Sequence, residues 1–340
     1  MISTLNTKRK TGKRSNSFRL QLLFFLEISE PFAAAFLLRD VGSRLQQLFL
    51  LENTAKADYK NMIYLSQDKE LMGYRLLDAC PFLAHFVTTR QGGVSRGTYA
   101  SFNCSPYTSD ASIHVMQNQQ HLLRLLKHPV RELVLPHQVH GCEIQTIGAD
   151  FFTRPLEERR TLLEGVDALI TREPGVCIGV TTADCVPVLL CDTKRRVVAA
   201  VHAGWKGTVK HIVALTMQRL RAEFGTEGRD VLAAIGPSIS LSSFEVGDEV
   251  VEAFREAGFA VEELASRFPV SSDLSAASSS PGKYHIDLWE ANRRELLEAG
   301  VPAAQIETAG ICTYQHHEQF FSARRLGIDS GRILSGIMIV

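Results

Sequence analysis

Short apolar runs alternate with polar turns along most of this chain, and their periodicity predicts its elements. Runs rich in β-branched and apolar residues predict strands at 83–89, 132–135, 166–171, 176–182, 231–235, 306–311 and 333–339. Apolar residues at helical spacing predict helices at 111–126, 208–224, 247–257 and 287–299. Several predicted strands follow one another without a helix between them. That order favours an α+β class with mixed sheets over a doubly wound parallel sheet.

A further pair of apolar runs, 186–191 and 197–201, flanks the polar stretch Asp192-Thr193-Lys194-Arg195 and predicts a β-hairpin. With Thr193-Lys194 at the tip, Cys185 lies opposite His202. Directly opposed side chains in an antiparallel pair have Cβ atoms about 4.5–5.5 Å apart. A thiolate and an imidazole at that distance can share a metal ion, or can act as nucleophile and base.

Residues 1–61 have a different pattern from the rest of the chain. A basic cluster at 8–14 precedes two apolar runs, 20–26 and 32–38, which are separated by Glu27 and Glu30. Each run is far shorter than the roughly 20 residues that span a bilayer, and no convincing signal-peptide cleavage site follows. We interpret 1–61 as an N-terminal extension, poorly ordered or a mis-assigned start, and 62–340 as one catalytic domain. The stretch 271–282, rich in Ser and Ala, predicts a surface loop.

Composition narrows the class of protein. The 340 residues are 45% hydrophobic with a formal net charge of zero, which gives no reason to expect a nucleic-acid or membrane partner. The seven cysteines are odd in number and scattered through apolar runs, a usage typical of a reducing, cytoplasmic compartment. Most of them are predicted to be core residues, with Cys185 and Cys312 as the exceptions.

Three residues form the strongest chemical constellation: His140, Cys185 and His202. Each ends a strand-like run beside small or turn residues, where a scaffold exposes functional groups. Three nitrogen and sulfur ligands leave a fourth position open, as in catalytic zinc sites that activate water at neutral pH. The alternative is that the three residues are unrelated and half buried.

The segment 202–207, His-Ala-Gly-Trp-Lys-Gly, precedes a predicted helix and predicts an anion pocket with Lys206 as a point charge. Arg90, beside Gly92-Gly93, is a second candidate anion contact. A plain helix entry and a solvated arginine are the alternatives. Asp184, adjacent to Cys185, is a candidate acid or a support for the ligands, and a structural turn aspartate is the alternative.

The order of motifs in the chain resembles that of a known family. The motifs are TTRQGGVSRGTYASFNCS, QVHG, GVDALIT, TADCVPVLL, HAGWKG, GPSI, CT and FFSARR. They are similar to the YfiH/laccase-domain family of zinc-dependent purine nucleoside phosphorylases, also described as polyphenol oxidases or peptidoglycan editing factors. The resemblance covers 62–340, and implies a four-layer α/β/β/α sandwich in a single domain.

The resemblance also implies roles for residues. The family's metal ligands map onto His140, Cys185 and His202, whereas His137 lies outside the motif and receives no role. Asn103, within the first motif, joins Arg90 and Lys206 as a candidate contact for substrate or phosphate.

The implied reactions are phosphorolysis of adenosine, inosine and 5′-methylthioadenosine to base and sugar 1-phosphate, and deamination of adenosine to inosine. The expected cofactor is zinc, and the expected partners are purine nucleosides and phosphate. The expected oligomeric state is a monomer. The sequence does not identify the residue that protonates the departing base.

Three other functions fit parts of the pattern. A copper-dependent polyphenol oxidase is the first, because two histidines and one cysteine also form a blue-copper set. A multicopper oxidase needs many clustered histidines, however, and the 11 histidines here are dispersed and include no His-x-His pair. A cysteine hydrolase that edits peptidoglycan precursors would use Cys185 as nucleophile and His202 as base. The third alternative is a binding protein with a structural zinc ion. Structural zinc sites are closed by four protein ligands, so the presence of only three candidate ligands argues against it.

Overall fold

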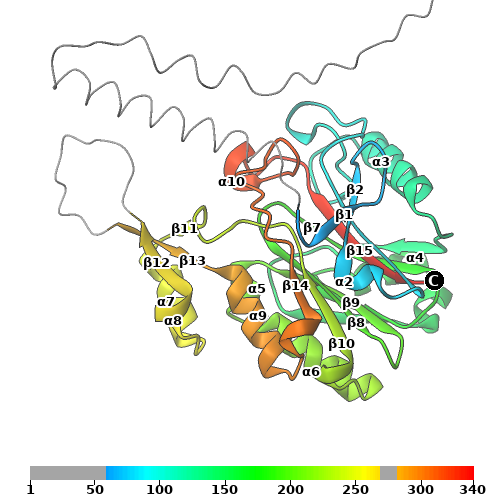
Figure 1. The fold of residues 1–340 in the computed structure, drawn as a ribbon. Coiled ribbons are helices and arrows are strands. Elements are labelled where there is room, and N and C mark those ends of the chain that lie inside the picture. The colour runs from blue at the N-terminus through cyan, green and yellow to red at the C-terminus, as the bar shows by residue number, and fades with distance from the viewer. Residues whose placement is uncertain (1–58, 269–281) are drawn as a thin grey trace, which may run out of the picture. The chain divides into compact units, whose positions relative to one another are not determined.

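A computed structural model describes residues 59–268 and 282–340, and the chain from Tyr59 to Val340 forms one compact unit (Figure 1). Most of the predicted extension, 1–58, and most of the predicted loop at 271–282 lie outside the described residues.

Two six-stranded sheets form the centre of the unit, and each mixes parallel with antiparallel pairs. The first sheet has the order β1(Met62–Tyr64), β2(Leu71–Tyr74), β3(Leu83–Thr88), β15(Ile333–Ile339), β7(Val176–Thr182), β4(Glu132–Val134). The second has the order β14(Ile306–Thr308), β10(Val231–Ile235), β8(Val186–Asp192), β9(Val197–Ala203), β6(Val166–Thr171), β5(Glu143–Ile147). A small third sheet has the order β11(Glu245–Val246), β13(Lys283–Ile286), β12(Ala265–Phe268).

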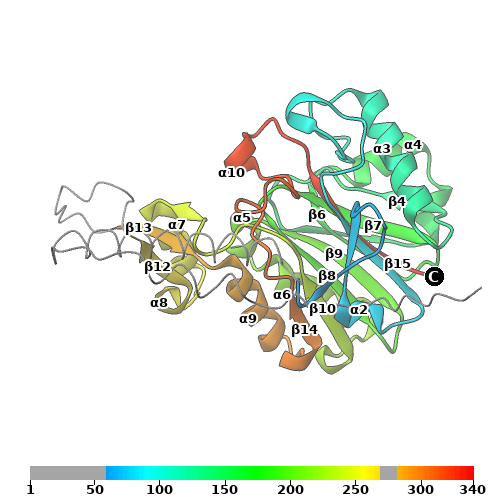
Figure 2. The same cartoon turned by 45° about the horizontal axis from the view of Figure 1, so that its top comes forward.

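Helices connect and flank these sheets. They are α2(Arg75–Asp78), α3(Ser112–Leu125), α4(Leu156–Leu162), α5(Trp205–Thr208), α6(Ile212–Phe224), α7(Asp248–Glu256), α8(Val261–Leu264), α9(Leu288–Glu298) and α10(Ala323–Leu326). In both views α3 and α4 lie on one side of the sheets and α6 and α9 on the other (Figures 1 and 2). The third sheet, α7 and α8 project together to one side.

The alternation of side chains along buried strands builds the core. In β8, Val188 and Leu190 pack into a cluster with residues of α6 and α9, whereas Leu189 and Cys191 pack with residues of β7 and β15 of the other sheet. Both faces of β8 and β9 are buried, which explains their nearly continuous apolar sequences. The outer face of the first sheet is covered in the same way, with Leu334 packed in a cluster with Leu122 of α3.

The mixed α/β class with mixed sheets is therefore confirmed, and four predicted strands (166–171, 176–182, 231–235 and 333–339) match the structure residue for residue. Several short elements were not predicted, among them β5, α4 and the third sheet. These segments are short or carry mixed polar and apolar residues, so their periodicity is weak.

Two predicted elements were wrong in extent. The helix predicted at 208–224 is interrupted between α5 and α6, because His211 adopts a left-handed conformation with φ of 59°. Its ring lies 2.7 Å from Glu295 Oε1 and 2.9 Å from the carbonyl oxygen of Ala257, and these tertiary contacts accompany the break. The strand predicted at 306–311 ends at Thr308, after which the chain turns away from the sheet.

Within residues 59–268 and 282–340, no helix combines the length and the apolar character that crossing a bilayer requires.

Residues 59–61 lie just before the predicted start of the domain at Met62, and two of them form hydrogen bonds with the rest of the folded chain. The Tyr59 hydroxyl donates a hydrogen bond of 2.6 Å to Gln319 Oε1, and Asn61 Nδ2 donates one of 2.8 Å to the Thr308 carbonyl. A chain shortened to begin at Met62 should fold but lose both bonds. Its free energy of unfolding should fall by about 1–3 kcal/mol relative to a chain beginning at Tyr59, at about 0.5–1.5 kcal/mol per bond.

Urea denaturation of the two shortened chains and the full chain measures this difference. The chain beginning at Tyr59 should match the full chain in stability. A large loss of stability in that chain would show that residues before Tyr59 contribute to the folded unit.

Candidate metal centre

The hairpin of β8 and β9 carries two of the three predicted ligands, in a register that differs from the prediction. Pro187 pairs with His202 and Val186 with Ala203, so Cys185 lies across from Gly204 and not from His202. The prediction placed the tip one residue too early, which shifts the pairing by two residues. Because side chains alternate with a period of two, an even shift leaves Cys185 and His202 on the same face, now as diagonal neighbours.

Gly204 makes this close approach possible. A Cβ atom at residue 204 would lie 2.9 Å from Cys185 Sγ and 3.1 Å from His140 Cδ2. Both distances are shorter than ordinary van der Waals contact, so a larger residue would push the ligands apart. The glycine of the 202–207 segment therefore makes room for the side chains at the centre.

His140 reaches the hairpin from the loop between β4 and β5. It adopts a left-handed backbone with φ of 61°, uncommon for a residue other than glycine. The loop is held by Asp167 of β6, whose carboxylate accepts hydrogen bonds from the backbone N–H groups of Val139 (3.3 Å), His140 (3.0 Å) and Gly141 (2.6 Å). These bonds place the His140 ring against that of His202, with 4.8 Å between ring centroids.

The same carboxylate orients His202. Asp167 Oδ1 lies 2.7 Å from His202 Nδ1, and both side chains are almost completely buried. An ionised carboxylate only accepts hydrogen bonds, so Nδ1 carries a proton that it donates to Asp167, and Nε2 is the nitrogen left to bind a metal ion. Burial by itself would raise the pKa of Asp167, but the hydrogen bond and charge of His202 and the bonds from Gly141 and Val139 outweigh it and lower the pKa.

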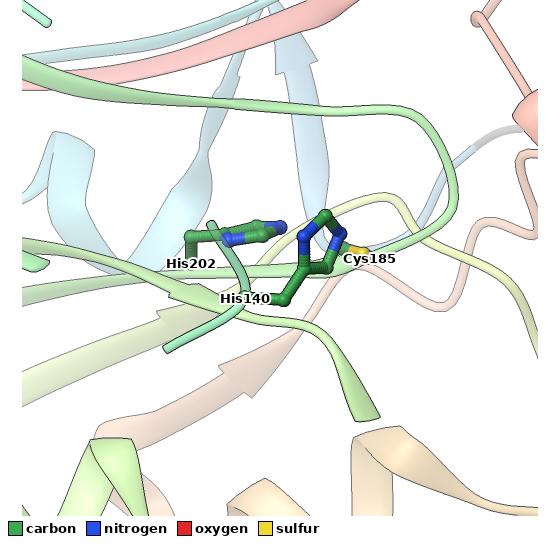
Figure 3. Close-up of side chains that lie close together, drawn as sticks. All are labelled: His140, Cys185 and His202. Carbon is green, nitrogen blue, oxygen red and sulfur yellow. The ribbon is translucent and has the colours of Figure 1, made fainter. Parts of the chain in front are cut away.

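The three side chains converge (Figure 3). One ligand atom from each of His140, Cys185 and His202 lies within 4.8 Å of the others. Within residues 59–268 and 282–340, these three side chains are the cluster of His, Cys, Asp or Glu that could hold a metal ion. Two imidazole nitrogens and a thiolate are ligands that zinc and copper both bind. The carboxylate behind His202 is the support that metal-bound histidines usually have. The residues present therefore fit a metal ion.

The surroundings of Cys185 favour the ionised, thiolate form of its side chain. Burial tends to raise its pKa, but the charge of His202 and hydrogen bonds from His140 and His202 lower it to about 6. Reciprocally, burial tends to lower the pKa of His202, but the Cys185 charge and the Asp167 hydrogen bond raise it to about 9. The ionised thiol is the form of cysteine that binds metals and that attacks electrophiles.

A cavity of about 160 Å³ opens beside the three ligands. Its lining combines residues of both six-stranded sheets and their loops: Ser105, Tyr107, His137, Gln138, His140, Thr181, Thr182, Ala183, Cys185, His202, Ala323, Ile328 and Arg332. Arg332 is the one arginine or lysine in this lining. Its guanidinium donates to the carbonyl oxygens of Ser330, Gly331 and Ile328, which fixes the position of the charge.

Asp184 precedes the candidate ligand Cys185 and also has a left-handed backbone, with φ of 87°. Its carboxylate accepts a bond of 2.6 Å from the Thr313 hydroxyl and one of 2.7 Å from the Arg324 N–H. Asp184 thereby joins the loop before β8 to two segments near the C-terminus. This bonding favours the structural alternative for Asp184 over a role as an acid.

The three residues predicted to contact substrate or phosphate are absent from the cavity lining. The Arg90 guanidinium donates to the carbonyl oxygens of Ala100 and His317 and lies over the Phe321 ring, 5.1 Å from its centroid. Lys206 is exposed, with its Nζ 5.7 Å from the ring centroid of Trp205.

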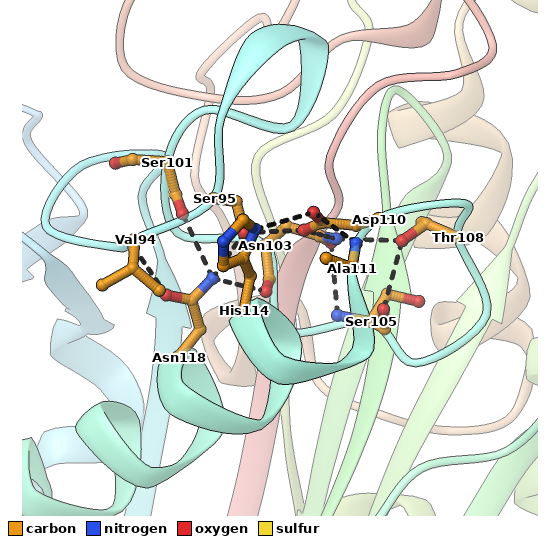
Figure 4. Close-up of polar contacts among 10 residues, drawn as sticks. All are labelled: Val94, Ser95, Ser101, Asn103, Ser105, Thr108, Asp110, Ala111, His114 and Asn118. Carbon is orange, nitrogen blue, oxygen red and sulfur yellow. Dashed lines mark hydrogen bonds and ion pairs between the residues drawn. The ribbon is translucent and has the colours of Figure 1, made fainter.

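Asn103 is completely buried in a polar network (Figure 4). Its Nδ2 donates to Thr108 and Asp110, and its Oδ1 accepts from the Ser105 and Arg332 N–H groups. Asn103 therefore supports the backbone of Arg332 and of the Ser105 loop. Cys312, the other cysteine singled out, packs in the core with its Sγ 3.4 Å from Ser243 Oγ.

Comparison with known proteins gives three kinds of match. The family model described as multi-copper polyphenol oxidoreductase laccase matches residues 84–340. A Bacteroides thetaiotaomicron protein named purine nucleoside phosphorylase is 53% identical over 278 residues, which cover 82% of this chain and 99% of the relative.

A protein of an unknown prokaryotic organism, named adenosine deaminase RL5, is 43% identical over 252 residues, 74% of this chain and 92% of the relative. The crystal structure of the Bacillus licheniformis hypothetical protein YfiH has a TM-score of 0.70 at 28% identity, and the match covers 80% of this chain and 97% of that one.

Two residues of the centre were not identified from the sequence. Asp167 interrupts the apolar run of β6. A single charged residue inside a strand that is otherwise apolar could have indicated a functional or structural role, because charged residues are rarely buried unless they are paired. Arg332 directly precedes β15, but no feature of the sequence places that strand end beside the ligands. Its position depends on the pairing of β15 with β7, whose C-terminal end enters the loop to Cys185.

Asp167→Asn tests the role of the carboxylate. The amide cannot accept hydrogen bonds from His202 and all three N–H groups as a charged carboxylate does. We therefore expect the affinity for a divalent metal ion, measured with zinc as the probe, to fall about 10–100-fold, as is typical when a group supporting a ligand is lost. Competition with a chromophoric chelator measures the affinity. Asp68→Asn, in an exposed turn, is the control. Unchanged affinity in the Asp167 variant would contradict this role.

Proposed function

This chain belongs to the multi-copper polyphenol oxidoreductase laccase family, and we propose on that premise that it is a purine nucleoside phosphorylase that also deaminates adenosine. The motif-based resemblance is confirmed by the family match and by the similarity to YfiH. The observation that carries the proposal is the three-ligand cluster beside a cavity with a fixed cation. The relatives' names, a phosphorylase and a deaminase, support both reactions.

We propose zinc as the metal, held by His140, Cys185 and His202, and adenosine, inosine and 5′-methylthioadenosine as substrates. Bound zinc would act as a Lewis acid and would activate water at neutral pH. Copper is the second candidate, because the same three ligand types form blue-copper sites. The seven cysteines, all unpaired, support a reducing compartment such as the cytoplasm. A monomer remains our expectation.

Arg332 is the residue that we propose to hold phosphate. Its three bonds to carbonyl oxygens fix the guanidinium, and an arginine pairs with phosphate through charge-assisted hydrogen bonds. Burial lowers the pKa of Arg332, and the nearby charges of Cys185, Tyr99 and Asp184 oppose that effect. A partly buried cation gains strongly from an anionic ligand, because little water competes for it.

The rim of the cavity suits a flat base. Tyr107 and Ile328 line it, and these large apolar side chains are 45% and 77% exposed. A purine ring can be stabilised by such surfaces through burial and stacking. We therefore propose that the base lies at the rim, with the sugar and phosphate toward Arg332.

A cysteine hydrolase is the second candidate function. The lowered pKa of Cys185 and the neighbouring His202 are features of an activated nucleophile as well as of a metal ligand. The two functions differ in their need for His140. A hydrolase needs one nucleophile and one base, whereas a metal site needs all three side chains.

Replacing each ligand separately distinguishes these functions. In the phosphorylase, Cys185→Ala, His140→Ala and His202→Ala should each reduce zinc affinity by more than the roughly 100-fold expected for losing a supporting group. Phosphorolysis and deamination should fall in parallel. Elemental analysis and product assays measure both. Full activity in rigorously zinc-free wild-type protein, or a substrate-derived adduct on Cys185, would support the hydrolase instead.

A pair of variants tests which cation holds phosphate. Arg332→Gln should raise KM for phosphate about 10–100-fold, because a hydrogen bond to a charged group contributes about 1.5–3 kcal/mol. Deamination, which uses no phosphate, should change much less. Lys206→Ala should leave both reactions within about twofold of wild type, the usual range for an exposed charge. The reverse pattern would assign the phosphate to Lys206, as the sequence suggested.

A further inference from the structure

His137 is a second histidine in the cavity, and the metal centre does not use it. It lines the same cavity as the three ligands, three residues before His140. Its backbone is fixed on both sides, since its N–H donates to the Leu163 carbonyl (2.9 Å) and its carbonyl accepts from the Gly165 N–H (3.0 Å). The chain thus holds His137 at a defined place beside the ligands.

The ring of His137 is also held. Nδ1 lies 2.6 Å from Glu164 Oε1, and the ring stacks on Tyr107 with 4.5 Å between centroids and 20° between planes. Because an ionised carboxylate only accepts hydrogen bonds, Nδ1 carries a proton that it donates to Glu164. Nε2 is therefore the nitrogen that gains or loses a proton. A histidine oriented by a carboxylate is a common general acid or base.

The other titratable side chains in the cavity lining are less suited to proton transfer. His140, Cys185 and His202 are the proposed metal ligands, and Arg332 does not lose its proton in proteins. Burial and the charge of Glu164 raise the pKa of Tyr107 against the opposing charge of Arg160, which makes its phenol a weaker acid than an exposed tyrosine. Glu164 is the charged group bonded to His137, Arg332 is the cation in the same cavity lining, and Arg160 is close enough to Tyr107 to lower the pKa of that phenol.

We propose that His137 is the general acid that protonates the departing purine base, with Glu164 as its positioning residue. This inference rests on the proposed phosphorylase function. A phosphate oxygen forms a bond to the anomeric carbon of the sugar while the glycosidic C–N bond breaks, and its electron pair moves into the base. The Nε2 proton of the His137 imidazolium passes to N7 of the base. Nε2 then regains a proton from the acidic hydrogen of the phosphate group.

A methylated substrate separates this role from a structural one. In 7-methylinosine the base already carries a positive charge and leaves without protonation at N7. With inosine, His137→Gln should lower kcat about 10²–10⁴-fold, the usual contribution of a general acid, with little change in KM. With 7-methylinosine, the same variant should react within a few-fold of wild type. Glu164→Gln should show the same selectivity with a smaller loss.

The controls separate failure of the inference from failure of the proposed function. Zinc content and thermal unfolding of the His137 and Glu164 variants should match wild type, and His128→Gln, outside this cavity, should react normally with both nucleosides. If wild-type protein with zinc and phosphate releases no ribose 1-phosphate from inosine, the proposed function and this inference both fail. If wild type is active but His137→Gln is normal with both nucleosides, or equally impaired with both, the inference alone is overturned.

Discussion

The buried carboxylate of Asp167 is the interaction on which the candidate centre depends. It comes from β6, beside the edge strand β5 of the second sheet, and accepts bonds from His202 Nδ1 and from three successive N–H groups of the His140 loop. One side chain thus fixes the orientation of one ligand and the backbone of another. A buried charge is costly unless it is fully paired, and here each bond that satisfies the carboxylate also places part of the site.

A second constraint is space. The ligands approach one another because residue 204 has no side chain, and because His140 and Asp184 adopt left-handed backbones that non-glycine residues seldom adopt. Asp184 is held in this conformation by bonds to Thr313 and Arg324, far along the chain. Strained residues of this kind persist where surrounding contacts over-determine them, and they often mark functional sites.

The cavity requires both sheets. The second sheet supplies His202, whereas Thr181, Thr182 and Arg332 come from ends of β7 and β15 in the first. The apolar core between the sheets, with Val180 and Ile333 from one and Leu189 and Ala200 from the other, holds these strand ends in place. This arrangement allows a cation, the exposed side chains of Tyr107 and Ile328 and the ligand cluster to share one small cavity. It is also why the cation in the cavity lining, Arg332, comes from a different part of the chain from Arg90 and Lys206.

The sequence by itself determined the class of fold, most long elements and the three candidate ligands. Apolar periodicity is a local property, and it was sufficient for strands such as β6 and β7 and for the face on which Cys185 and His202 lie. His140 was singled out by its place at the end of a strand-like run beside Gly141, and the motifs supported its assignment as a ligand. Period-two alternation cannot distinguish registers that differ by two residues, so the partner of Cys185 was wrong.

Only the tertiary structure decided where each polar group points. Arg90, Asn103 and Asp184 are of residue types that often bind substrates. In the structure, however, they form hydrogen bonds with other residues of the protein. Asp167, Arg332 and His137 are placed beside the ligands by strand pairing and loop contacts between residues distant in sequence. A polar side chain forms its bonds with whatever the fold brings near it, and the sequence around it does not contain that information.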